Sequence, residues 1–248
     1  MIYRVEGIVI RSMDYGEGNK IITLFSKEVG KVSVMARGAK KVKSRHAAAV
    51  QPFTHGYYTF FKGGSMGTLN DAEIIDSFHT LREELKLAAY CSYLTELTDR
   101  MLEDQEAHGF LFEQLKAAFQ SMAEGKDADI LVHIYEMKML AFAGYSPELM
   151  QCVSCGEPSG EMVFSVSMGG ILCGRCKAKD ARAHVLSGGL LKLLRLFEKL
   201  DIRRLGQTDV KEQTKLQLKT LIRAYLDTHI GLQLKSRNFL EQMEKYGI

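Results

Sequence analysis

The chain has 248 residues, of which 46% are apolar and 25% charged, so it can bury a core in about one to three domains. No run approaches about eighteen consecutive apolar residues, which excludes a predicted membrane span. The formal net charge is only +3, but the charge is unevenly distributed along the chain. Residues 1–70 are basic, with eleven Lys and Arg against four Asp and Glu, and residues 71–150 are acidic, with six against sixteen. Residues 151–248 are basic again, with sixteen against ten.

The first 78 residues are predicted to form five strands. Runs rich in Ile, Val and aromatic residues cover 2–13, 20–26, 31–37, 50–61 and 66–78, and glycine-containing turns separate most of them. The longest connection follows the third run. Five short strands in this order fit a small Greek-key barrel of the OB type, and a plain meander sheet is the alternative.

The long connection is strongly basic and holds no acid between its first and last cation: Arg37, Lys40, Lys41, Lys43 and Arg45. Most such charge runs are solvated loops with no special role. Two features favour a functional interpretation, the further cations around the predicted barrel (Arg11, Lys20, Lys27, Lys62) and the aromatic strand that follows (Phe53, Tyr57, Tyr58, Phe60, Phe61). OB domains hold single strands with such cations and rings.

Alternation along a strand sends about half of those rings inward. The sequence leaves open whether Tyr58 and Phe60 or Tyr57 and Phe61 face outward. No residue pattern here predicts that base edges are read, so we expect binding without sequence specificity.

The middle of the chain is predicted to be helical. Apolar residues recur every three or four positions over 81–102, 110–122 and 130–142. Asp127 can cap the third of these helices, and the stretch from Gly144 to Pro147 ends it. Because the many carboxylates of this block repel DNA, we expect a scaffold or a protein-binding surface.

Four cysteines follow as two CxxC pairs, Cys152 with Cys155 and Cys173 with Cys176, separated by seventeen residues. This is the spacing of a four-thiolate zinc site, and a closed shell of four thiolates makes the predicted Zn²⁺ structural rather than catalytic. Two disulfides or four unrelated thiols are the alternatives. The fifth cysteine, Cys91, is expected in the core. An odd cysteine, and an opening without the features of a signal peptide, favour a reducing cytoplasm.

The last part of the chain is predicted to be helical and basic. Ser187 can cap a helix over 190–200, and Asp209 with Glu212 can start another that runs to about residue 230. Cations on the second helix are spaced by four: Lys211, Lys215, Lys219 and Arg223. Acids of the middle block could neutralise this row. The sharper interpretation is a second anionic contact, to phosphate or to an acidic peptide of a partner.

No motif of an enzyme is present in the sequence. It has no P-loop, no GxSxG and no HExxH, and the deaminase pattern fails because residue 151 is Gln and no HxE occurs. We therefore expect no catalytic residues.

Several of these stretches resemble the bacterial RecO family: YRVEGIVI at 3–10, NKIITLFS at 19–26, EVGK at 28–31, and RGAKKVKSR at 37–45 before QPF at 51–53. Gly144 and Tyr145, followed by the two CxxC pairs, resemble the zinc-bearing members. The blocks occur in the same order, so the resemblance covers essentially the whole chain. Asn19 stands where the family often has an acid.

The resemblance implies an α+β protein, with an OB-type five-stranded barrel over 1–79, a helical domain over 80–150 and 177–248, and a zinc-binding segment over 151–176. It implies a recombination mediator that binds single- and double-stranded DNA, anneals complementary strands, and works with RecR and the single-strand-binding protein to load RecA. Such a protein would be cytoplasmic and nucleoid-associated. The alternatives are a protein-only adaptor and a zinc-dependent enzyme that modifies nucleic acid.

The resemblance also assigns roles to residues. Six would contact phosphate: Lys31, Arg37, Lys40, Lys41, Lys43 and Arg45. The barrel interpretation adds Arg11, Lys20 and Tyr57 to this DNA-binding set. The acidic, apolar-ended tail of the single-strand-binding protein would dock in the helical part, where Lys215, Lys219 and Arg223 are the candidate contacts.

Overall fold

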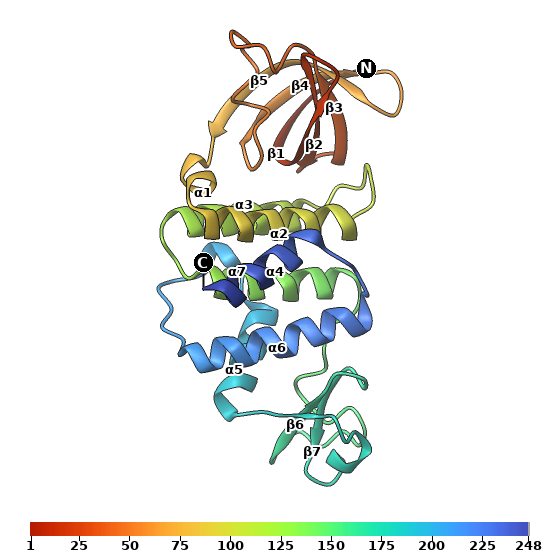
Figure 1. Cartoon of the computed structure of the whole chain (residues 1–248). Helices are drawn as coiled ribbons and strands as arrows, with labels where there is room; N and C mark the ends of the chain where they lie inside the picture. Colours follow the sequence, from red (N-terminus) through yellow and green to blue (C-terminus); the bar gives the residue numbers. More distant parts are fainter. Residues whose placement is uncertain (248) are drawn as a thin grey trace. The chain divides into compact units, whose positions relative to one another are not determined.

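The computed structural model describes residues 1–247, which form two compact units (Figure 1). The first unit consists of Met1–Gly125 and Leu234–Ile248, and the second of Lys126–Gln233. The C-terminal segment thus belongs with the N-terminal half of the chain. The boundaries of these two units differ from those of the predicted barrel, helical domain and zinc-binding segment. The predicted three-part division is therefore not tested by them and stays a prediction.

The first unit begins with a closed five-stranded barrel, with strands in the order β1-β2-β3-β5-β4. The strands are β1 (Ile2–Tyr15), β2 (Asn19–Ser26), β3 (Gly30–Ala36), β4 (His55–Lys62) and β5 (Gly67–Asp76). β1 closes the barrel by pairing antiparallel with β4, and β3 pairs parallel with β5 rather than with β4. This pairing confirms the OB-type barrel, because a meander would pair β3 with β4.

The predicted fourth strand began too early. Residues 50–54 form turns in which the Val50 N–H donates to the His46 carbonyl and the Phe53 backbone has a φ of 72°. A left-handed residue cannot continue a strand. The strand therefore starts at His55.

The barrel core follows the alternation of the strands. Val9, Leu24, Val34, Tyr58 and Phe60 are fully or almost fully buried in one cluster inside the barrel. The Tyr58 hydroxyl donates to the Ala49 carbonyl at 2.9 Å, which satisfies the one polar group of that ring in the core.

Helices cover one side of the barrel (Figure 1). They are α1 (His79–Glu83), α2 (Leu85–Met101) and α3 (Gly109–Ala123). From the end of the chain, α7 (Lys235–Tyr246) packs against α2. Phe112 and Phe119 of α3 pack edge-on against Phe25 and Phe53 of the barrel part, with ring centroids 5.8 and 5.6 Å apart. The periodicity predicted α2 and α3, whereas α7 was not anticipated.

The second unit combines helices with a small sheet. Its elements are α4 (Ala128–Phe142), β6 (Met162–Ser165), β7 (Gly170–Cys173), η1 (Lys177–Lys179), β8 (His184–Val185), α5 (Gly188–Lys199), η2 (Ile202–Arg204) and α6 (Glu212–His229). The predicted caps at Asp127 and Ser187 are confirmed by hydrogen bonds from Ile130 and Leu190. The predicted start at Asp209 is wrong, since Lys211 is the N-cap of α6. No described helix is long and apolar enough to cross a membrane.

Candidate nucleic-acid interface and metal centre

The basic connection after β3 folds into a compact series of turns. The Gly38 N–H donates to the Asn19 side-chain oxygen at 2.8 Å, and the Lys40 N–H donates to the Gly18 carbonyl at 3.1 Å. Gly38 has a φ of 67°, which a residue without Cβ adopts at little cost. Asn19, the departure from the family pattern, thus anchors this loop.

Three cations of the loop point into solvent. Arg37, Lys41 and Lys43 are exposed, and none of them has a side-chain hydrogen bond or ion pair within the described residues. Their charges are available to an anionic ligand. Val42 between them is fully exposed.

The other predicted cations near this loop are partly engaged. Lys40 and Lys20 both pair with Asp14, at 2.8 and 3.0 Å, and the hydrogen bond from Lys40 is the main cause of the lowered pKa of that carboxyl. Arg45 donates to the Asn70 carbonyl at 2.8 Å. Such exposed ion pairs contribute little stability, so a phosphate can replace them at small cost.

Lys31 requires a correction. Its side chain is only 8% exposed, and its ammonium group donates to the Asp99 carbonyl and pairs with the carboxylates of Asp99 and Asp104 at 3.2 and 3.4 Å. Lys31 was assigned to phosphate by the resemblance, but it joins the barrel to the end of α2. A buried cation with three acceptors is not free for DNA.

Tyr57 lies on the outer face of β4, 37% exposed, and Phe61 lies further along the same face, 51% exposed. Tyr58 and Phe60 point inward. The Arg4 guanidinium stands over the Tyr57 ring, 5.2 Å from its centroid, and pairs with Glu73. The fold thus decides the alternation that the sequence left open. Arg11 is also exposed, at the bulge that interrupts pairing between β1 and β2.

The four predicted metal ligands come together in the second unit. The Sγ atoms of Cys152, Cys155, Cys173 and Cys176 all lie within 4.8 Å of one another. Cys173 ends β7, and the Cys176 N–H donates to the Cys173 carbonyl, which forms the turn of the second pair. The Val153 N–H donates to the Ile171 carbonyl at 2.9 Å and ties the first pair to the same hairpin.

The sulfur geometry fits a tetrahedral ion. A Zn–S bond of about 2.3 Å implies sulfurs about 3.8 Å apart, and the Sγ atoms of Cys155 and Cys173 are 3.6 Å apart. All four are free thiols, which removes the disulfide alternative. Burial acts to raise the pKa of Cys152, but backbone N–H groups of Cys173, Ser154 and Cys155 lower it to about 6. These N–H groups favour the thiolate that binds metal.

The predicted partner row on α6 is engaged in part. Lys215 is only 16% exposed and pairs with Asp127 at 2.6 Å and Glu212 at 2.7 Å. Burial acts to lower its pKa, but those two carboxylates raise it overall. Lys219 and Arg223 also have partners in the fold. Asp127, an acid of the middle block, therefore neutralises Lys215, which agrees with the alternative that acids of that block neutralise the row.

One ionic cluster was missed by sequence reasoning. Glu6 of β1 binds His55 of β4 at 2.9 Å and Lys116 of α3 at 3.0 Å, and Glu113 continues the cluster by pairing with Lys116 and Lys27. These residues lie up to 110 positions apart. No local pattern in the sequence signals such a contact.

Comparison with known proteins agrees with this geometry. Residues 1–78 match the family model "Recombination protein O N terminal", and residues 82–238 match "Recombination protein O C terminal". The chain belongs to the RecO family.

Similar RecO proteins span the full chain. DNA repair protein RecO of Halalkalibacterium halodurans is 48% identical over 100% of this chain and 97% of its own length. The protein of that name from Bacillus pumilus is 46% identical over 98% and 95%, and that from Bacillus mycoides 46% over 100% of both. The predicted resemblance is thus confirmed over both units.

Proposed function

We propose that this protein is a recombination mediator in DNA repair that binds single- and double-stranded DNA without sequence preference. The observation that carries the proposal is the exposed cationic loop on the barrel of a RecO-family chain, in which Arg37, Lys41 and Lys43 have no partner among residues 1–247. The names of its relatives, DNA repair protein RecO, point the same way.

The mechanism rests on charge neutralisation. Two complementary strands repel each other through their phosphates, and cations that neutralise those phosphates lower the repulsion. Tyr57, exposed on β4, offers a ring on which an unpaired base can stack. Strands held in this way can exchange bases into a duplex. No covalent bond is made or broken, so no catalytic residue is assigned.

The four cysteines would hold one structural Zn²⁺. Their donor set and spacing suit that ion, and a complete thiolate shell leaves no position for a substrate. When bound, the ion would cross-link the two cysteine pairs around the β6–β7 hairpin. Its role is to keep the segment folded.

The resemblance to the RecO family supports a proposal for the partners. We propose that the protein works in the cytoplasm, on the nucleoid, with RecR and the acidic tail of the single-strand-binding protein, and so helps to load RecA. Lys219 and Arg223 remain the proposed contacts for that tail, while Lys215 is committed to Asp127. Within the barrel, Arg11, Lys20, Lys40 and Arg45 remain proposed DNA contacts.

The test is a salt titration of binding to a fluorescent single strand. Lys41→Glu combined with Lys43→Glu should make the plot of log affinity against log salt shallower by about 0.7 for each phosphate that is no longer neutralised. It should also slow annealing of complementary strands. The control is Lys86→Glu with Lys245→Glu, an equal change of charge at two exposed helix positions. A loop variant that keeps the wild-type slope would refute the proposed interface, and a wild type that ignores oligonucleotides in dilute buffer would favour a protein-only adaptor.

A further inference from the structure

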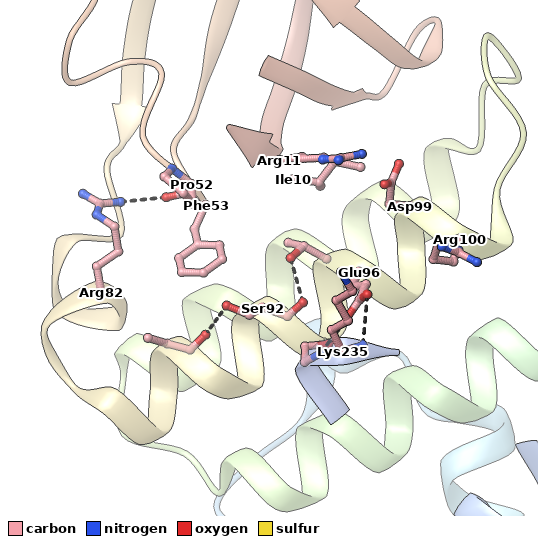
Figure 2. Close-up of a pocket in the computed structure, with 13 residues that line it drawn as sticks. Ile10, Arg11, Pro52, Phe53, Arg82, Ser92, Glu96, Asp99, Arg100 and Lys235 are labelled. Atoms are coloured by element: carbon pink, nitrogen blue, oxygen red, sulfur yellow. Dashed lines mark hydrogen bonds between the residues drawn. The ribbon is translucent and has the colours of Figure 1, made fainter. Parts of the chain in front are cut away.

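A pocket of about 530 Å³ lies in the first unit, where the barrel meets α2 and the start of α7 (Figure 2). Its size is within the range of small-ligand sites, roughly 300–1,000 Å³. Its lining comes from four places in the sequence: β1, the turn before β4, helices α1 and α2, and α7. Of its lining residues, only Arg11 is among the DNA contacts proposed above, and the pocket itself has no assigned role.

The pocket is cationic. Arg11, Arg82, Arg100 and Lys235 line it, against two carboxylates, Glu96 and Asp99. Both carboxylates are already engaged: Glu96 accepts from the backbone N–H groups of Lys235 and Ser236, and Asp99 binds Lys31. The lining therefore attracts an anion, because its cations outnumber its carboxylates and both carboxylates already have partners.

Three of these cations are available. The side chains of Arg11, Arg100 and Lys235 are on exposed residues and make no hydrogen bond or ion pair within the described part of the chain. Burial acts to raise the pKa of the nearby Glu96 carboxyl, but hydrogen bonds from Ser236 and Lys235, and then the charge of Arg100, lower it overall. Arg82 differs, because its guanidinium donates to the carbonyls of Pro52 and Ser77. It fixes the turn that carries Phe53.

Part of the lining is apolar. Ile10, Pro52, Phe53 and Ala88 contribute to it. The bulge in β1 between Val9 and Arg11 shifts the strand register, and it brings Ile10 and Arg11 together at the same site. Phe53 has a left-handed backbone and packs against Phe119, and backbone strain of this kind is concentrated at functional sites.

We propose, on the basis of the DNA-binding function above, that this pocket takes one nucleotide unit of an unpaired strand. Its phosphate would lie against Arg11, Arg100 and Lys235, and its base against the apolar lining residues. Arginine suits this role because its planar fork binds phosphate oxygens in pairs. Arg11 is both an exposed residue of β1 and a lining residue of the pocket, so it can contact a strand that lies on the barrel.

The site would distinguish paired from unpaired DNA. A base inside a duplex is stacked and hydrogen-bonded, and entering a pocket would require it to leave the stack at a cost of a few kcal/mol. An unpaired base has no such cost. The pocket would hold a single strand until its complement pairs with it and draws the nucleotide out.

The test separates occupancy of the pocket from long-range charge. Ala88→Leu narrows the pocket without changing charge, and Arg100→Glu with Lys235→Glu reverses two of its cations. Both should weaken binding of fluorescein-labelled oligothymidine by roughly tenfold, the effect expected when one base can no longer stack. Both should also reduce the salt slope by about 0.7 for each phosphate that leaves the site. Lys86→Glu with Lys245→Glu, which makes the same change of charge on α2 and α7 outside the pocket, should leave both quantities near the wild type.

Two probes identify the source of the phosphate. Thymidine monophosphate that displaces the oligonucleotide from the wild type, but not from the Ala88→Leu variant, would show that a free nucleotide suffices. Displacement only by a second oligonucleotide would show that a strand is required. Either result agrees with the proposal, because both place a nucleotide in the pocket.

Other results would overturn the proposal. If the pocket variants bind the oligonucleotide like the control while the Lys41→Glu/Lys43→Glu variant does not, the pocket proposal fails and the loop interface stands. If the pocket variants lose binding of hexa-aspartate but keep that of the oligonucleotide, the pocket is a peptide site. If the wild type binds no oligonucleotide, both proposals fail together. Unchanged thermal melting of each variant confirms that it is folded.

Discussion

At the scale of single residues, two lysines of equal charge have opposite roles. Lys31 and Lys41 both belong to stretches that resemble the RecO family, and the resemblance assigns both to phosphate. In the fold Lys31 is buried against Asp99, whereas Lys41 is exposed with no partner among the described residues. The difference depends on α2, which lies far along the chain from both.

Lys31→Gln should therefore lower the free energy of unfolding by about 1–3 kcal/mol, because it leaves the Asp99 carboxylate without its buried partner. The salt slope of DNA binding should not change. Lys41→Gln should do the reverse, with unchanged urea unfolding and a shallower slope. A Lys31→Gln variant of full stability and reduced slope would contradict this assignment.

His55 gives the barrel a dependence on pH. Burial lowers its pKa, although Glu6 acts in the opposite direction, and its second ring nitrogen has no hydrogen-bond partner in the described structure. A histidine with a lowered pKa contributes stability that is complete above the unfolded value of 6.5 and is lost as the pH falls below it. The lowered pKa of Glu6, despite its burial, extends the loss below 4.5.

We expect the free energy of unfolding in urea to be lower at pH 5.5 than at pH 7.5. This decrease should be smaller in His55→Gln than in the wild type. The upper limit for one group is about 1.4 kcal/mol per pH unit. His46 also has a pKa lowered by burial, so His46→Gln serves as a comparison. An equal acid loss in His55→Gln and the wild type would exclude His55 as a source.

At the scale of elements, α7 is attached to the first unit through its N-terminus. Leu234, its N-cap residue, makes no side-chain cap. The carboxylate of Glu96 on α2 instead accepts from the Lys235 and Ser236 N–H groups, at 3.1 and 2.8 Å, and from the Ser236 hydroxyl. A carboxylate at this end also favours the helix dipole. A distant residue thus supplies the cap.

Glu96→Ala should destabilise the protein by about 1–2 kcal/mol, the usual cost of losing an N-cap. The effect should be concentrated in α7, so hydrogen exchange should accelerate over Lys235–Tyr246 before it does in the barrel strands. Glu103→Ala, an exposed acid beyond the end of α2, is the control. Hydrogen exchange that accelerates equally in every element would contradict a local effect of Glu96 on α7.

At the scale of the whole molecule, two compact units share one chain that leaves the first unit at Gly125 and returns at Leu234. The cysteine cluster lies in the second unit and the basic loop in the first. Each unit has its own core residues, such as Tyr58 in one and Phe197 in the other. We therefore expect the proposed metal site and the proposed DNA contact to be separable in stability.

Removal of the proposed zinc ion should unfold part of the second unit and leave the barrel folded, because structural zinc contributes roughly 10–16 kcal/mol in finger peptides. Chelation should produce a separate, earlier melting transition. Cys155→Ser should lose the ion in a metal assay, while Cys91→Ser keeps it, since Cys91 is buried in the core of the other unit and burial raises the pKa of its thiol. If the chelator changes neither the melting temperature nor the helix content, the cysteines must have another role.

Short-range patterns were sufficient for much of this protein. Strand alternation, helical periodicity, the caps at Asp127 and Ser187 and the spacing of the four cysteines each depend on residues close in sequence, so the sequence predicts the barrel, most helices and the metal ligands. The cationic loop is also local. Its exposure follows from having too many like charges to bury.

Packing in three dimensions was needed to establish which residues meet across long distances. The burial of Lys31 by α2, the Glu6–His55–Lys116 cluster, the return of α7 to Glu96 and the outward face of Tyr57 depend on which elements pack together. A local pattern states what an element hides or exposes, but its partner is chosen by the packing of the whole chain. For that reason the sequence determined the chemistry of this protein, and the fold decided which of its charges remain free to act.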